Sequence, residues 1–245
     1  MSADWIAVLA IGLAAGTLGG IVGFGSSVIL VPVLAFAFGP KAAVPIMAVA
    51  SLMGNVARVA VWWRHIDWRT AGAYALAAAP AAALGARTML AMPIGAIEAA
   101  LGAFLIAMVP ARRALRARGL RIGPAQLALA GAATGFLTGI VASTGPLSAP
   151  LFLACGLVKG AYLSSEALGS VAVYLAKAIV FERSDALPAR FVAQGVAVGS
   201  TLMAGSWLAK RVVDRMSVRD FGRLMDAILV LAGGAMLVQA LGARA

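Results

Sequence analysis

The chain consists of apolar runs long enough to cross a membrane, separated by short polar breaks. The first run, at 5–22, contains 18 residues, which is enough for a membrane helix. Charged residues make up only 12% of the chain, whereas soluble domains contain about 25%. Because so few polar groups cannot cover the surface of a soluble protein, lipid must solvate much of the molecule. We therefore predict an all-α integral membrane protein. Further long runs fall at about 43–63, 70–90, 93–110, 124–142, 161–181, 189–209 and 220–242.

Two runs are too short to span a bilayer, and each follows a break rich in glycine and hydroxyl residues. The run at 28–38 has 11 residues and follows Gly-Phe-Gly-Ser-Ser at 23–27. The run at 147–158 has 12 residues and follows Ala-Ser-Thr-Gly-Pro at 142–146. Runs of this length are typical of re-entrant or broken membrane segments. We expect one short or re-entrant half-helix in each half of the chain, and the sequence leaves open whether it spans or turns back.

The two halves of the chain are related by an internal repeat. The stretch GTLGGIV at 16–22 matches GFLTGIV at 135–141 at an offset of 119, with five of seven residues identical. Both copies lead directly into a break, and both breaks are followed by a short apolar run that contains proline. The order of segments in each half is long, short, long, long, long. Matching words and matching segment order together indicate a duplication.

The repeat and the basic residues together predict a topology. We expect two membrane repeats, 1–115 and 116–245, that form one transport domain. Each half has five segments, an odd number, so the second half should be inverted relative to the first. Loops rich in Lys and Arg usually stay in the cytoplasm. With the connector 111–121 placed there, 13 of the 20 basic residues lie inside, five lie outside and two lie within segments. The sequence thus predicts a multi-pass protein of the inner (plasma) membrane with both termini periplasmic.

The two breaks have the composition of an anion site near the middle of the membrane. An unpaired backbone group in hydrocarbon is strongly unfavourable, so non-helical backbone at that depth must be buried in protein or line a wet cavity. A helix that begins after each break presents N–H groups and partial positive charge, which favour an anion. Hydroxyl groups add donors, and neither break contains an acidic residue. The alternative is that these small residues only pack helices together.

We predict substrate-binding residues in the breaks and on the helices that follow them. Asn55 is equally suited to line a substrate path or to join helices, and Arg58 could attract an anion. For Arg58 and Lys177 we favour another role, in which the side chain extends toward lipid headgroups. Glu166, like Glu98 and Asp226, could carry a coupling proton if buried, but a hydrated carboxylate near the interface is favoured. The predicted substrate-binding residues are Gly23, Gly25, Ser26, Ser27, Asn55, Arg58, Ser143, Thr144, Gly145, Ser148, Ser170 and Tyr174.

The sequence resembles the TauE/SafE sulfite-exporter family, also called the toluene-sulfonate uptake permeases (TSUP). The resemblance covers nearly the whole chain and rests on GTLGGIVGFGSSVILVPVL, its second copy GFLTGIVASTGPLSAPLF and the order of segments. It implies a secondary transporter that moves sulfite, sulfonates or related organic anions across the inner membrane. Breaks in this family are usually richer in glycine. The hydroxyl residues found here fit an oxyanion.

Three classes of function remain to be weighed. We expect a secondary transporter of a small sulfur-containing anion, with a small carboxylate or another anion as the alternative substrate. A non-transporting membrane subunit is a second alternative, although it would not need two related breaks. An intramembrane enzyme would need a nucleophile with a base or a metal cluster, and the chain has one His and one Cys. We expect no catalytic residues, no cofactor and no metal. The expected partners are a small anionic substrate and the lipid bilayer, and we expect no nucleic acid. The sequence leaves open whether the chain forms a homo-oligomer.

Overall fold

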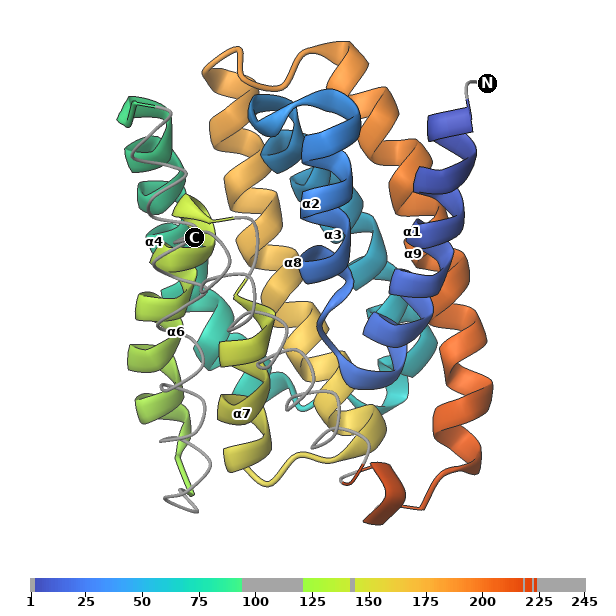
Figure 1. The fold of residues 1–245 in the computed structure, drawn as a ribbon. Helices are drawn as coiled ribbons and strands as arrows, with labels where there is room; N and C mark the ends of the chain where they lie inside the picture. Colours follow the sequence, from blue (N-terminus) through green and yellow to red (C-terminus); the bar gives the residue numbers. More distant parts are fainter. Residues whose placement is uncertain (1–2, 94–120, 142–143, 218, 222, 224–245) are drawn as a thin grey trace, which may run out of the picture.

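The structure is a computed structural model that describes residues 3–93, 121–141, 144–217, 219–221 and 223. Within these residues it is all-helical (Figure 1). The expected long segments at 93–110 and 220–242, and the connector 111–121, fall almost entirely outside the described residues. The described elements are α1 (Ala3–Val22), α2 (Ser26–Phe38), α3 (Pro40–Trp62), the 3₁₀ turn Trp63–His65, α4 (Trp68–Ala91), α6 (Pro124–Ile140), α7 (Gly145–Ala154), α8 (Lys159–Arg183) and α9 (Ala189–Arg215).

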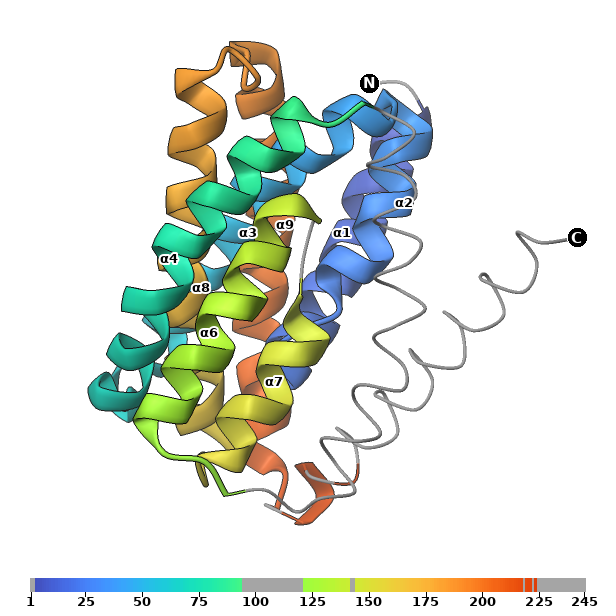
Figure 2. The same ribbon diagram turned by 90° about the vertical axis from the view of Figure 1, so that its left-hand side faces the viewer.

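Among the described residues, four helices are long and apolar enough to cross a membrane. They are α1 over Trp5–Val22, α3 with its 3₁₀ turn over Ala42–His65, α8 and α9. α4 and α6 lie beside them in the same bundle (Figure 2). The predicted class, an all-α membrane protein, is therefore confirmed by the helical content and by these four candidate spans.

The two breaks each end a long helix and begin a short one. At a rise of about 1.5 Å per residue, helices of 13 and 10 residues extend only about 20 and 15 Å, against about 30 Å for the hydrocarbon core. α2 packs along α1 and α3, and α7 packs against α6 and α8. The two short helices run in opposite directions away from the middle of the bundle (Figure 1). Neither short helix is long enough to cross the bilayer alone.

The long helices pack in the order α1, α9, α3, α8, α4, α6, each against the next. At both ends of this row the backbones come into direct contact through glycine. A Cβ on Gly16 of α1 would lie 2.7 Å from the Cα of Leu202 on α9. A Cβ on Gly139 of α6 would lie 2.6 Å from the backbone nitrogen of Ala86 on α4. The first helix of each half thus packs against a helix of the other half, which brings the two breaks toward one region of the protein.

Candidate functional site

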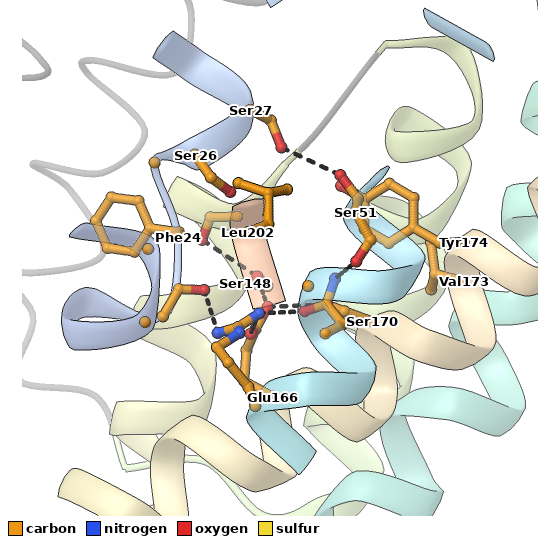
Figure 3. Close-up of a pocket in the computed structure, with 18 of the residues that line it drawn as sticks. Phe24, Ser26, Ser27, Ser51, Ser148, Glu166, Ser170, Val173, Tyr174 and Leu202 are labelled. Carbon is orange, nitrogen blue, oxygen red and sulfur yellow. Dashed lines mark hydrogen bonds and ion pairs between the residues drawn. The ribbon is translucent and has the colours of Figure 1, made fainter. Parts of the chain in front are cut away.

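A polar pocket lies between the two breaks, in the middle of the bundle (Figure 3). The space between its lining atoms is about 590 Å³, its opening included. Phe24 and Ser26 lie across this space from Val173 and Tyr174 (Figure 3). α1, α2, α3, α4, α6, α7, α8 and α9 all contribute lining residues. The pocket therefore exists only when both halves of the chain are assembled.

Two glycines shape the first break. Gly23 and Gly25 have φ values of 87° and 102°, in the left-handed region that side chains disfavour. A Cβ on Gly23 would meet the hydroxyl oxygen of Tyr162 at 2.5 Å, whereas a Cβ on Gly25 would meet nothing within 4 Å. Gly25 therefore opens toward the pocket, and α2 begins at Ser26 beside it. Ser26 has no hydrogen-bond partner among the described residues, so its hydroxyl is available to a ligand.

The second break begins α7 with a different local structure. Thr144 precedes the helix and is only 3% exposed. Its hydroxyl bonds to that of Thr138 and lies 3.3 Å from the carbonyl oxygen of Thr134. A ligand that used the Thr144 hydroxyl as a donor would have to compete with these two groups. Ser143, the neighbouring predicted residue, lies outside the described residues.

Arg58 and Glu166 form a buried ion pair in the pocket. Their side chains, from α3 and α8, approach to 3.0 Å, and the two residues are 8% and 2% exposed. Arg58 also donates to the backbone carbonyl of Gly23 and to the side-chain oxygen of Asn55. The expectation that Arg58 extends toward headgroups is therefore wrong. Its guanidinium instead donates a hydrogen bond to a backbone carbonyl at the first break. This carbonyl receives no donor from a helix, because α1 has ended there.

The two carboxylate oxygens of Glu166 differ in the hydrogen bonds that they accept. Its Oε1 accepts hydrogen bonds from Ser148 at 3.0 Å and from Ser170 at 2.9 Å. Its Oε2 is buried and makes no hydrogen bond to any described residue, and its contact is the ion pair with Arg58. The favoured expectation of a hydrated carboxylate near the interface is wrong for this residue, because α8 places it between α3 and α7 at the pocket.

Lys177 donates hydrogen bonds to backbone carbonyls at the second break, as Arg58 does at the first. It is fully buried, and its Nζ donates to the carbonyls of Thr138 at 2.8 Å and Val141 at 2.7 Å. These carbonyls lie at the end of α6, so the favoured expectation of a headgroup contact is again wrong. Arg58 and Lys177 are 119 residues apart, the offset of the repeat. α3 and α8 also begin 119 residues apart, at Pro40 and Lys159, so the two cations occupy equivalent positions.

The structure brings the predicted site residues other than Ser143 together, whereas their role in binding stays a prediction. Sequence reasoning missed several lining residues, among them Ser51, Tyr74 and Ser206. Tyr74 gave no signal, because one aromatic in an apolar helix usually packs in a core. Within the described part of the chain, no three His, Cys, Asp or Glu residues are placed to hold a metal ion. The predicted residues that line the pocket are Gly23, Gly25, Ser26, Ser27, Asn55, Arg58, Thr144, Gly145, Ser148, Ser170 and Tyr174.

Helices long enough to cross a membrane, together with two short helices that follow breaks, surround a polar pocket, and this is the architecture of a membrane transporter. Comparison with known families gives the particular group. The chain matches the family described as Sulfite exporter TauE/SafE over residues 8–236, nearly its whole length, and it belongs to that family. No curated protein and no solved structure matched the chain.

Proposed function

We propose that the chain is a secondary transporter of a small sulfur-containing anion, sulfite or a sulfonate, across the inner membrane, and that the central pocket binds this anion. The observation that carries the proposal is the convergence of two helix starts, several hydroxyl groups and one arginine on a single pocket. The starts of α2 and α7 both border the pocket. Gly25 before α2 has no side chain to cap its helix, and the Thr144 side chain does not cap α7. Such helix ends favour a small oxyanion.

We further propose an inverted relation between the halves, with both termini periplasmic. The order of packing supports a two-fold relation between the halves. Replacing each helix by its counterpart at the repeat offset gives the row α1, α9, α3, α8, α4, α6 in reverse order. The opposite directions of α2 and α7 support the inversion itself (Figure 1). Such pairs of broken helices around a midplane site are a recurring design of secondary transporters, and no part of this proposal needs an enzymatic step.

The proposal is tested by titrating sulfite and methanesulfonate into purified wild-type protein and into Ser26→Ala, Thr144→Ala and the double variant. Each single change should weaken binding by about 0.5–1.5 kcal/mol, or up to about 3 if the hydroxyl bonds to a charge. The Ser26 effect should be the larger one, because Thr144 already bonds within the protein. The double variant should depart from additivity, since both hydroxyls would face one ligand.

Ser200→Ala is the matched control, because Ser200 is exposed on α9 and its hydroxyl bonds only to its own helix at Val196. It should bind both anions like the wild type. Equal affinities in all the pocket variants would place the ligand elsewhere. Binding of small carboxylates instead of sulfur anions would identify the alternative substrate class, and no uptake of any anion into proteoliposomes would indicate a non-transporting subunit.

A further inference from the structure

The charges that line the pocket cancel when it is empty. Among its lining residues, all within the described part of the chain, Arg58 is the cation and Glu166 the acid. The other buried cation among the described residues, Lys177, is directed to carbonyls at the end of α6 and is not among the lining residues. An anion that enters therefore meets a neutral pair, and its charge adds to that of the Glu166 carboxylate. Two negative groups sharing one buried arginine repel strongly, because the interior screens charge poorly.

We propose that Glu166 is the proton-binding site that couples anion transport to proton movement, with one proton bound by its carboxylate for each monovalent anion that occupies Arg58. This inference rests on the proposed function. In the empty state Arg58 pairs with the Glu166 carboxylate. In the loaded state Arg58 pairs with the anion while Glu166 holds a proton taken from the side from which the anion entered. The pocket is then neutral in both states, and the proton and the anion leave together.

The hydrogen bonds around Glu166 identify the oxygen that takes the proton. Oε1 already accepts from Ser148 and Ser170. Oε2 is buried and makes no hydrogen bond, and within the part of the chain that the structure describes its partner is Arg58. When an anion draws Arg58 away, Oε2 is left without a partner, and an unpaired buried charge is highly unfavourable. Protonation at Oε2 removes that charge and creates an O–H donor beside the bound anion.

Among the described residues, few titratable groups besides Arg58 lie near Glu166. Arg58 on α3 is its ion-pair partner. The phenols of Tyr74 on α4 and of Tyr162 on α8 are close enough to interact with its charge, and Tyr174 lines the same pocket. The neighbouring helix α7 contributes the hydroxyl of Ser148. Tyrosine and arginine side chains keep their protons near neutral pH, so Glu166 is the group in this cluster suited to exchange one.

The test uses the full-length purified protein and methanesulfonate, whose charge does not change with pH. Affinity is measured by calorimetry from mildly acidic to mildly alkaline pH for wild type and Glu166→Gln. Wild-type affinity should fall as pH rises, by up to about tenfold per pH unit, the slope of one linked proton. Glu166→Gln mimics the protonated acid and should bind at all these pH values with little change. In proteoliposomes, wild type should carry protons with methanesulfonate, whereas Glu166→Gln should exchange the anion across the membrane without moving protons.

Glu182→Gln is the matched control, because Glu182 is an exposed carboxylate near the other end of α8. It should behave like the wild type in both assays. Repeating the binding series with sulfite covers that substrate, since the comparison with Glu166→Gln cancels the proton that sulfite itself can carry. A wild type whose affinity is independent of pH, or a Glu166→Gln variant that still moves protons, overturns the coupling site. A folded wild type that binds neither anion at any pH contradicts the proposed function itself and removes the coupling with it.

Discussion

At the scale of single residues, the buried pair of Arg58 and Glu166 predicts a specific pattern of stabilities. Arg58→Gln leaves the Glu166 carboxylate buried without its cation, which should cost up to about 3–5 kcal/mol of folding free energy. The double variant Arg58→Gln with Glu166→Gln removes both charges and should recover much of that loss. Thermal and denaturant unfolding in detergent measures both effects.

Arg58→Lys is the control for this pattern, because it keeps the charge but loses the forked geometry that reaches Gly23, Asn55 and Glu166. It should be more stable than Arg58→Gln and still bind sulfite less tightly than wild type. A double variant no more stable than Arg58→Gln alone would show that the pair does not stabilise the fold in this way.

The roles of individual charged residues were the least predictable part of the site. A lysine or arginine near the end of an apolar segment can extend to the headgroups or turn into the protein, and its own sequence neighbours do not decide which. The carbonyls that attract Arg58 and Lys177 lie at or just past the ends of other helices, 35 and 36–39 residues away along the chain. The usable signal was the repeat, because two intramembrane cations at its offset point to a shared task.

At the scale of helices, the glycine contacts predict where a methyl group cannot be added. In Gly139→Ala the new Cβ would press against the backbone of Ala82 and Ala86 on α4. The two backbones must then separate, which should cost about 1–3 kcal/mol by overpacking. The melting temperature of purified protein should fall accordingly.

Gly72→Ala is the matched control, since Gly72 is also inside a helix, α4, and a Cβ there would meet nothing within 4 Å. That variant should unfold at the same temperature as wild type or higher, because alanine favours helix by about 0.8–1.0 kcal/mol over glycine. An equal effect of both substitutions would mean that helix propensity, rather than the contact between α4 and α6, controls stability.

The short helices were predictable because both signals that define them are local. A run of 11 or 12 apolar residues cannot cross a bilayer, and the glycine and hydroxyl residues before it break the helix. The pairing of the long helices was not predictable. Small residues in α1 and α6 indicate close packing, but they do not say that α9 and α4, each from the other half, will cover them.

At the scale of the whole molecule, the repeat carried most of what the sequence could predict. It placed the residues of both breaks around one site, and in the structure the first break, Thr144 and Gly145 line one pocket. The repeat could not predict that Tyr74 and Ser206 belong to the site. They reach the pocket from α4 and α9 only because each half packs against the other. A pocket built between two halves depends on long-range packing, which no local pattern in either half encodes.

The orientation of the whole chain in the membrane is testable at the two ends of α9. Ser184 lies in the loop before this helix and Ser217 follows it, and both are exposed. The 210–223 stretch carries five basic residues, so the end of α9 should face the cytoplasm and Ser184 the periplasm. Each serine is replaced by cysteine in a Cys155→Ala background, since Cys155 is the native cysteine. In intact cells a membrane-impermeant maleimide should label Ser184→Cys at once, whereas Ser217→Cys should react only after permeabilisation. Labelling of both positions from outside would contradict the crossing by α9. Labelling of Ser217→Cys alone would leave the crossing intact and reverse the orientation, and with it the predicted periplasmic location of both termini.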